Sequence, residues 1–298
     1  MGTPFISLLE PTPLQWERGV PPDEQPARSS IPRTFLDAMT VRTQVFVEEQ
    51  KVPAENEYDS DDPRSAHWVI YASVNQTISP ALTDPETGEV IQPRRSETRS
   101  VPIGTVRLVP FPHPPHPLNG GVYVDGELVG DNTEPEEKGA HGEGGAPLAQ
   151  QASSPDQQKQ QQQQDHRRAS SVPSFTTDRP TDFHDGQEPY VKLGRLAVLK
   201  DFRGRGIARQ LVLTAVDWMR KNPTHFDPSP AERGFEQLGM EQGGELPRWR
   251  GLFCCHAQED AVNVWERCGF QVDKAMGKWM EEGIPHMGMF LRVDIDRR

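Results

Sequence analysis

Hydrophobic residues recur along the chain with helical spacing in some segments and with two-residue alternation in others. In the segment 34–50, Phe35, Leu36 and Met39 lie near helical spacing, which predicts a helix. Seven further elements follow in the order strand, strand, strand, helix, strand, helix and strand, at residues 66–73, 103–109, 190–199, 206–220, 251–258, 259–268 and 287–293. This order predicts a mixed α/β layered domain.

The strand predicted at 190–199 changes its hydrophobic phase part-way along. Odd positions 191 and 193 are apolar in its first half, and even positions 196 and 198 are apolar in its second half. The change falls at Gly194, and a glycine there indicates a β-bulge, which would turn the strand away from its neighbour and open a gap in the sheet. A strand buried on both faces explains the same pattern, so both interpretations stand at this point.

Polar, proline-rich stretches precede and interrupt these elements. Residues 112–187 contain a glutamine tract at 157–164 and almost no apolar periodicity, which predicts a disordered insertion rich in Pro, Gly and Gln. Residues 222–248 predict a loop insertion, and residues 1–33 a polar, proline-rich N-terminal segment. With 25 glycines, 29 prolines and 34% hydrophobic residues among 298, the chain is too polar for one dense core. We therefore expect one interrupted domain over 34–298, whose folded part has roughly 150 residues.

Charge and cysteine usage narrow the possible partners. The formal net charge of −12 argues against binding to a nucleic-acid phosphate backbone, and an acidic surface favours cationic partners such as amines or serves solubility alone. No apolar run approaches the roughly 18 residues of a membrane span, and the first residues lack the layout of a secretion signal. Cys254, Cys255 and Cys268 lack metal-ligand spacing, and their odd number is typical of a reducing compartment. We expect a cytoplasmic or nuclear protein without a metal, a membrane or a nucleic-acid partner; the oligomeric state stays open.

A glycine-rich turn, Arg203-Gly204-Arg205-Gly206-Ile207-Ala208, joins the strand at 190–199 to the helix at 206–220. Glycines at a strand-to-helix turn allow successive backbone N–H groups to face one concavity, and the helix N-terminus adds partial positive charge. The turn has neither the Walker pattern nor the spacing of the dinucleotide GxGxxG motif. It predicts a binding site for a phosphate or pyrophosphate group.

Four segments, in order along the chain, resemble the GNAT superfamily of acyl-CoA N-acyltransferases. LAVLKDFRGRGIARQLV (196–212) looks like its acetyl-CoA segment, and HAQEDAVNVWERCGF (256–270) resembles the strand and helix that follow. VRTQVFVEEQKVPAENEYDSDD (41–62) and EEGIPHMGM (281–289) are similar to the narrower ElaA-like branch. The resemblance implies a single GNAT-type domain with a mixed, mostly antiparallel sheet flanked by helices and interrupted by disordered insertions.

The resemblance also implies a reaction and the residues that support it. It implies an N-acetyltransferase that transfers an acetyl group from acetyl-CoA to a primary amine by direct attack in a ternary complex. A small cationic amine is the expected substrate, which can be attracted by the acids Glu48, Glu49, Glu55, Glu57, Asp59, Asp61 and Asp62, although a solvated loop explains these acids as well. Contacts to acetyl-CoA would come from Leu196, Ala197, Val198, Arg203, Gly204, Arg205, Gly206, Ile207, Ala208 and Gln258.

The attack requires a base, because an alkyl ammonium has a pKa near 10.4 and must lose a proton first. His256 is one candidate, near the end of the strand that would face the gap, and Glu49 on the helix at 34–50 is another. For both residues, a purely structural role is an alternative to catalysis. His67 and His286 are further candidates, for which a hydrogen bond to the backbone is the favoured interpretation.

The chain departs from the family pattern at the general acid. Many members carry a tyrosine four residues after an alanine that is Ala261 here, but this chain has Trp265. An indole N–H is no useful acid, and Tyr190 lies at the far end of its strand from the glycine turn. The replacement motivates an alternative function, a non-catalytic acyl-CoA-binding sensor or scaffold with a degenerate active site. A third hypothesis is an interaction protein in which the glutamine-rich insertion matters most.

Overall fold

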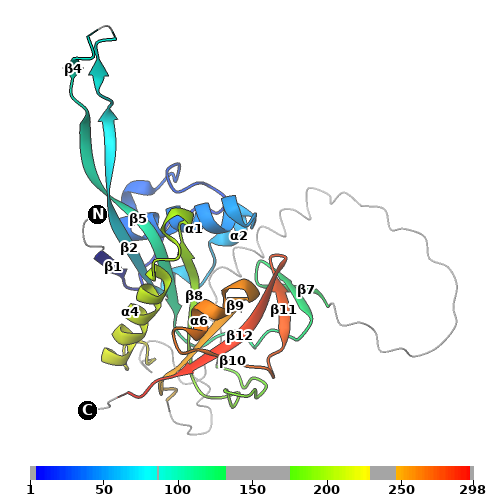
Figure 1. Cartoon of the computed structure of the whole chain (residues 1–298). Coiled ribbons are helices and arrows are strands. Elements are labelled where there is room, and N and C mark those ends of the chain that lie inside the picture. Colours follow the sequence, from blue (N-terminus) through cyan, green and yellow to red (C-terminus); the bar gives the residue numbers. More distant parts are fainter. Residues whose placement is uncertain (1–4, 86, 132–174, 229–245, 296–298) are drawn as a thin grey trace, which may run out of the picture.

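A ten-stranded sheet forms the centre of the computed structural model, which describes residues 5–85, 87–131, 175–228 and 246–295 (Figure 1). The strand order is β1-β2-β5-β8-β9-β12-β11-β6-β7, and β10 also pairs with β12. Their bounds are β1 Phe5–Leu9, β2 Ala66–Ser79, β5 Arg95–Val109, β6 Gly121–Val124, β7 Glu127–Asp131, β8 Val191–Val198, β9 Leu252–Gln258, β10 Gln271–Val272, β11 Lys278–Glu281 and β12 Ile284–Arg292. Neighbours are antiparallel except for β8 with β9 and β11 with β6. The predicted mixed, mostly antiparallel sheet is therefore confirmed.

Helices cover both faces of this sheet. Their bounds are α1 Arg33–Arg42, α2 Ala54–Glu57, α4 Ile207–Lys221 and α6 Val262–Glu266, and a π-helical segment, Thr43–Glu49, continues α1. Trp68 of β2 lies in one core cluster with Leu211 of α4, whereas the next residue, Val69, clusters with Ala38 of α1. Because successive residues of a strand point to opposite faces, α1 and α4 cover opposite faces, the α1 face and the α4 face below. Trp265 of α6 belongs to the cluster on the α4 face.

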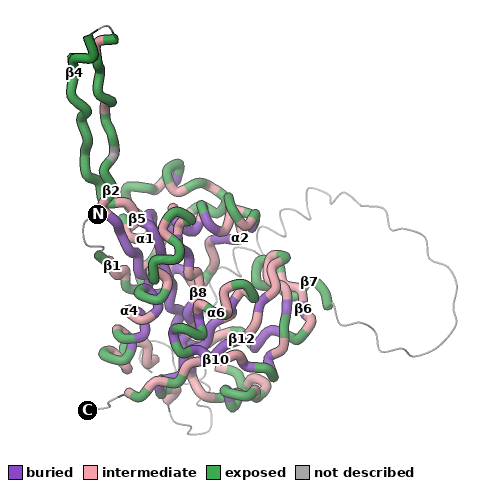
Figure 2. Tube along the Cα trace, in the orientation of Figure 1, coloured by how far each residue is buried: buried purple, intermediate pink, exposed green. Residues whose placement is uncertain are grey.

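The elements predicted from hydrophobic spacing are all present, with shifted ends. The helix predicted at 34–50 changes from α to π geometry after Arg42. The strands predicted at 66–73 and 103–109 extend into a longer antiparallel ribbon, whose outer part projects from the body together with the short pair β3 (Leu82–Thr83) and β4 (Val90–Gln92) (Figure 1). Figure 2 shows this outer part as mostly exposed. It contributes little to the core.

The insertion predicted to be disordered over 112–187 is structured at both described ends. β6 and β7 pair with each other, and β6 adds parallel to β11, so this segment extends the central sheet. At the other end, the ring of Phe175 lies 6.0 Å from that of Phe111. The predicted bounds are thus corrected, while residues 132–174, which include the glutamine tract, lie outside the described residues.

Two other predicted boundaries also change or remain open. The N-terminal segment 1–33 was expected to precede the domain, yet β1 pairs with β2 along five residues and forms an edge of the sheet. The folded part therefore begins before residue 34. Of the loop predicted at 222–248, residues 222–228 and 246–248 contain no helix or strand, and 229–245 lie outside the described residues.

Candidate functional site

β8 and β9 are parallel neighbours that separate after three residue pairs. Residues 191–193 of β8 pair with residues 253–255 of β9. Gly194 and His256 are the first residues beyond the last pair. β8 remains paired with β5 up to Val198, and β9 remains paired with β12 up to Gln258. Each strand therefore keeps one neighbour and has a backbone edge without a strand partner, as the bulge interpretation predicts.

A β-bulge in β8 lies at this point of separation. Arg195 and Leu196 together lie opposite the single residue Val106, between the pairs Arg107–Gly194 and Thr105–Ala197. The residue in the left-handed conformation is Arg195, with φ +47°, and not Gly194. A non-glycine residue is strained there and needs its surroundings to hold it. Arg195 Nη2 bonds to Asp59 Oδ2 at 3.0 Å, which supplies that support.

The glycine turn after β8 presents unengaged backbone amides. Gly204 and Gly206 have φ values of +73° and +78°, and a Cβ built on either would meet no atom within 4 Å. Among the described residues, the N–H groups of Gly204, Gly206, Ile207 and Ala208 have no acceptor. Since Gly206 is the N-cap of α4, these donors lie at the positive end of a helix dipole. Such an arrangement binds anions, phosphates in particular.

The arginine that opens this turn is held by the α1 side. The Arg203 guanidinium forms a two-point pair with Glu49, at 2.6 and 2.7 Å, and its Nε donates to the Val198 carbonyl at 2.8 Å. This hydrogen bond and charge lower the pKa of the Glu49 carboxyl below its usual value. Glu49 is therefore a weaker base than an ordinary glutamate. The guanidinium of Arg205 lies 5.8 Å from the centre of the Phe202 ring.

Backbone and amide groups line the region where β8 and β9 separate. Leu199 N donates to Ile103 O of β5, so the amide of Val198, which alternates with it, points away from β5. Across the separation, the side chains of Gln258 and Gln50 exchange two hydrogen bonds, at 2.9 and 3.0 Å. The side-chain amide of Gln258, which was predicted to contact acetyl-CoA, is therefore hydrogen-bonded to Gln50 in this structure. Of the other strand residues predicted to bind acetyl-CoA, Ala197 is buried and Leu196 is half-buried.

His256 and Glu281 form a hydrogen-bonded pair on the α1 face. His256 Nδ1 lies 2.9 Å from Glu281 Oε1, which also accepts a bond of 2.6 Å from Trp279 Nε1. With Nδ1 as the donor, Nε2 keeps its lone pair, and no described residue bonds to it. Burial lowers the pKa of His256 below 6.5, against the opposing effect of Glu281. Burial alone would raise the pKa of Glu281, but the charge of His256 and its hydrogen bond hold that pKa well below its usual range.

This pair has the form of a base with a positioning carboxylate. A neutral imidazole near pH 7 can take a proton on Nε2, and a half-buried carboxylate on Nδ1 stabilises the cation that results. Sequence reasoning identified His256 but missed Glu281. Only the position of Glu281 four residues before Pro285 of the GIPH segment could have drawn attention to it, and that spacing indicates no partner.

The remaining candidate acids and bases have structural roles. His67 Nε2 lies 2.9 Å from the Asp62 carbonyl and His286 Nδ1 lies 2.8 Å from the Ile284 carbonyl, which confirms the predicted backbone bonds. Trp265 is 3% exposed and packs on Phe270, on the α4 face. It therefore cannot reach a reacting group on the α1 face.

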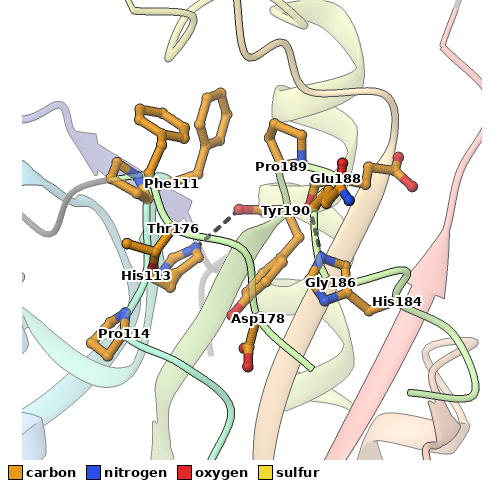
Figure 3. Close-up of a pocket in the computed structure, with 13 residues that line it drawn as sticks. Phe111, His113, Pro114, Thr176, Asp178, His184, Gly186, Glu188, Pro189 and Tyr190 are labelled. Atoms are coloured by element: carbon orange, nitrogen blue, oxygen red, sulfur yellow. Dashed lines mark hydrogen bonds between the residues drawn. The ribbon is translucent and has the colours of Figure 1, made fainter. Parts of the chain in front are cut away.

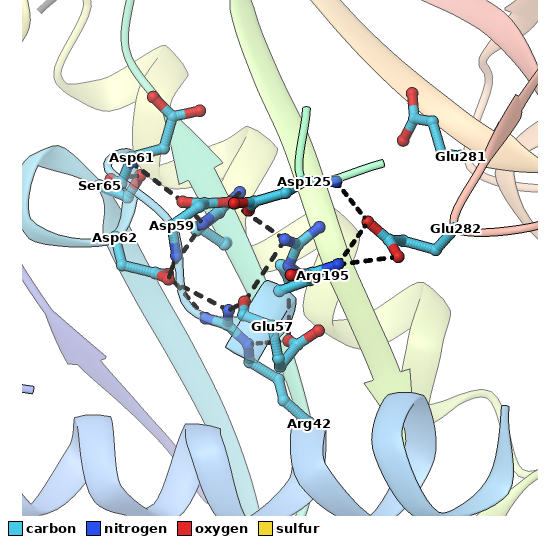
Figure 4. Close-up of polar contacts among 12 residues, drawn as sticks. Arg42, Glu57, Asp59, Asp61, Asp62, Ser65, Asp125, Arg195, Glu281 and Glu282 are labelled. Atoms are coloured by element: carbon cyan, nitrogen blue, oxygen red, sulfur yellow. Dashed lines mark hydrogen bonds and ion pairs between the residues drawn. The ribbon is translucent and has the colours of Figure 1, made fainter. Parts of the chain in front are cut away.

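Most of the acids expected to attract an amine are paired with arginines. Arg42, buried between Glu57 and Asp62, bonds to them at 2.6 and 2.7 Å. Arg107 lies 2.6 Å from Asp59 and 2.8 Å from Asp62. Figure 4 shows Glu57, Asp59 and Asp62 gathered around Arg42 and Arg195, and Asp59 Oδ2 lies 3.0 Å from Arg195 Nη2. Asp61 pairs with Arg64, and Glu49 with Arg203. Only Glu48 and Glu55 of the seven acids form no ion pair among the described residues, so little negative charge remains for an amine.

A small cavity lies at the opposite end of β8 from the turn (Figure 3). Its volume is about 50 Å³, and its lining includes Phe111, His113, His184 and Tyr190. His113 stacks on Tyr190 with ring centres 4.5 Å apart, and burial raises the pKa of the Tyr190 hydroxyl well above 10. The space suits ordered water rather than a cofactor. Tyr190 is thus a core residue far from the separation of β8 and β9.

The described residues contain neither a membrane-spanning helix nor a group of metal ligands. No helix there is long and apolar enough to cross a bilayer. Within the same ranges, no three or more His, Cys, Asp or Glu side chains gather as metal ligands would.

Three of the solved structures to which this chain is similar are distant from it in sequence. Escherichia coli ElaA is 14% identical, with a TM-score of 0.37, over 88% of this chain and 93% of its own. An acyl-CoA N-acyltransferase from Pseudomonas aeruginosa is 14% identical, with a TM-score of 0.39, over 98% and 100%. Arabidopsis thaliana NAA60 in complex with acetyl-CoA is 11% identical, with a TM-score of 0.32, over 97% and 99%. No curated protein matches the chain.

A family match falls on the segment that builds the site. Residues 174–226 match the model of the acetyltransferase (GNAT) family. They contain the bulged strand β8, the glycine turn with its unengaged amides, and α4. The match agrees with the resemblance drawn from the sequence: residues 174–226 are similar to the acetyltransferase (GNAT) family.

Proposed function

We propose that the protein is an N-acetyltransferase that transfers an acetyl group from acetyl-CoA to the primary amine of a small molecule, by direct attack within a ternary complex. The observation that carries this proposal is the separation of β8 from β9 immediately before a turn of unengaged amides at the start of α4. A thioester arm fits beside a strand edge, and a pyrophosphate fits the turn.

The chain's own groups suit acetyl-CoA. Because a Cβ at Gly204 or Gly206 would meet no atom, the turn has room for a phosphate to approach its backbone. The amides of the turn and the guanidinium of Arg203 would hold the pyrophosphate, with Gly204, Arg205, Gly206, Ile207 and Ala208 completing the site. The backbone of Leu196, Ala197 and Val198 would bind the pantetheine arm, and Gln258 would contact it after leaving Gln50. Bound acetyl-CoA supplies an activated acetyl group as a thioester.

His256 is the base in this proposal. It lies at the first position of β9 beyond the last pair with β8, and its Nε2 is open to a proton from the acceptor amine. The neutral amine nitrogen then forms a bond to the acetyl carbon and the carbon–sulfur bond breaks. The nitrogen loses its second proton to water, and the first proton stays on Nε2 until solvent removes it. Glu281 stabilises the imidazolium through Nδ1. Glu49, the other predicted base, is bound by Arg203 and has a lowered pKa, so we assign it a positioning role at the turn.

The departing thiolate needs no dedicated acid. An alkyl thiol has a pKa of about 8.5, so its thiolate is a fair leaving group near neutral pH, and water can protonate it. This accounts for a family-type site in which Trp265 replaces the usual tyrosine. The presence of Trp265 is therefore no argument by itself for a loss of catalysis.

Contacts across the α1 face support a small acceptor. Asn56 Nδ2 donates to both oxygens of Glu282, at 3.2 and 3.1 Å, and the Asp125 amide donates to Glu282 at 2.7 Å. These bonds join α2, the β6–β7 turn and the β11–β12 turn next to Glu281 (Figure 4). Because they tie three segments together beside Glu281, the partner of His256, they favour a small acceptor over a protein segment. The expectation of a cationic acceptor has less support, because most of the acids are paired.

Thiol release from acetyl-CoA over a panel of primary amines tests the proposal. We expect a raised melting temperature with acetyl-CoA and amine-dependent thiol release. The variant His256→Gln should retain the thermal shift and lose about 10²- to 10⁴-fold in turnover, the usual contribution of a general base. His225→Gln, an exposed histidine beside Trp218, is the matched control. Absence of any thermal shift would overturn the site, and binding without turnover for every amine would favour a sensor.

A further inference from the structure

The α1 face of β8 has open space at the point where β9 leaves it. Val191 and Leu193 belong to the cluster on the α4 face, so Lys192 and Gly194, which alternate with them, lie on the α1 face. A Cβ built on Gly194 would meet no atom within 4 Å. His256 lies on the same face, because Phe253, Cys255 and Ala257 of β9 belong to the α4-face cluster. The space over Gly194 therefore adjoins the proposed base.

Lys192 is a cation without a partner beside this space. It pairs in register with Cys254, two residues before His256 on the same face. Its charge lowers the pKa of His256 and that of His113, which places its ammonium within electrostatic reach of both. It forms no ion pair and no side-chain hydrogen bond with any described residue. Lys192 is half-buried as a whole residue, and its charge has no counter-charge among the described residues.

The charged groups of Arg195, Asp59 and Glu281 already have other partners. Arg195, the next cation along β8, is bound to Asp59, and Glu281 is bound to His256 and Trp279. Asp59 in turn is held by Arg107. Neither Asp59 nor Glu281 is therefore free to neutralise Lys192. An anionic group brought by a ligand would find one unpaired cation at this place.

We infer that the acceptor is a small amino acid, whose carboxylate is bound by Lys192 and whose amine is placed at His256 across the open space over Gly194. This inference rests on the proposed acetyl transfer and names the substrate class for it. Lys192 is two residues from Gly194 on the same face of β8, a Cα separation of roughly 6.6 Å along a strand, so a small ligand over Gly194 is within reach of a lysine side chain. A carboxylate on an ammonium is a charge-assisted bond, which fixes the orientation of the amine toward the base.

The test compares acceptors that differ only in the carboxylate. Glycine and β-alanine are assayed against glycinamide and β-alaninamide, by thiol release from acetyl-CoA. The wild-type protein should have a kcat/KM at least about 10-fold higher for the carboxylates than for the amides. In Lys192→Met, kcat/KM for the carboxylates should fall by about 10- to 100-fold, mainly through KM, while the amides are unaffected. Lys192→Arg should restore most of the preference, and Lys274→Met, an exposed lysine on another loop, is the control.

A second variant tests the space itself. Gly194→Val adds a side chain on the α1 face, where the built Cβ meets no atom, so the fold should tolerate it. We expect KM to rise for both kinds of acceptor, with the thermal shift by acetyl-CoA retained. Equal turnover of carboxylates and amides, or an unchanged preference in Lys192→Met, would overturn the inference and leave acetyl transfer standing. Failure of all primary amines, including diamines and amino sugars, would instead overturn the proposed function.

Discussion

The substitution Glu281→Gln separates the charge of the carboxylate from its geometry. An amide oxygen can still accept from His256 Nδ1 and Trp279 Nε1, which lie 2.9 and 2.6 Å from the present carboxylate oxygen. What is lost is the negative charge opposite the imidazolium that forms when the amine is deprotonated. A hydrogen bond to a charged partner contributes about 1.5–3 kcal/mol. Because about 1.4 kcal/mol corresponds to a tenfold change in rate, kcat should fall by about 10- to 100-fold.

The pH profile identifies this effect more specifically than the rate does. Removing the carboxylate removes the interaction that opposes the lowering of the His256 pKa by burial, so that pKa falls further. Activity requires neutral His256, and the acid limb of kcat should therefore move to lower pH by about one to two units, since one unit is 1.36 kcal/mol. Single-turnover thiol release between pH 5 and 8 measures both quantities, with the acetyl-CoA thermal shift as the check on folding.

A matched control changes the same charge without touching His256. Glu259→Gln removes an exposed carboxylate that pairs with Lys278 and should leave the acid limb in place. If Glu281→Gln lowers the rate without moving the acid limb, Glu281 supports the fold and not the base. An unchanged rate and an unchanged limb would show that His256 does not take the proton.

Three further outcomes follow from the structure. Gly206→Asp, which puts a negative charge at the open N-cap of α4, should abolish the thermal shift by acetyl-CoA, and Gly206→Ala should reduce it less. Arg42→Met leaves Glu57 and Asp62 as buried charges without this partner and should cost about 3–5 kcal/mol, or roughly 6–20 °C in Tm, by calorimetry; a drop under about 1 kcal/mol would contradict that role. Burial lowers the pKa of His67 to about 4, so below its unfolded pKa of 6.5 the unfolded chain binds more protons, and stability should fall by about 3 kcal/mol between pH 6.5 and 4. Urea unfolding of wild type and His67→Gln over that range measures the difference.

Periodic segments were the predictable part of the fold. The strands β8, β9 and β12 and the helices α1 and α4 each contain enough apolar residues to be predicted from their own sequence, without information about their neighbours. β11 is only four residues long, Lys-Trp-Met-Glu, and β6 and β7 lie among glycines and acids. None of these three strands shows an alternation of apolar and polar residues. They are strands because neighbours in the sheet pair with them.

The sequence predicted those parts of the candidate site that lie within one segment, but not the contacts between segments that are distant in the chain. The bulge and the glycine turn are backbone features that depend on local residues, and the sequence predicted both. The glycine turn lies where it was predicted, and the bulge lies one residue later, at Arg195 and not at Gly194. That exchange depends on Asp59, which lies more than 130 residues away in sequence. The pairing of His256 with Glu281, and of Glu49 with Arg203, depends in the same way on contacts between distant elements. No spacing within one segment encodes them.

The pairing of β6 with β11 has a consequence for the order in which the chain is made. Val122 and Met280 are register partners, yet about 160 residues separate them. At a synthesis rate of roughly 5–20 residues per second, the β6–β7 hairpin leaves the ribosome about 8–30 seconds before its partner strand. During that interval the edge of β6 that will meet β11 has no strand beside it, and open strand edges attract other chains. Nascent chains halted between residues 131 and 278 should therefore associate more readily than the completed protein.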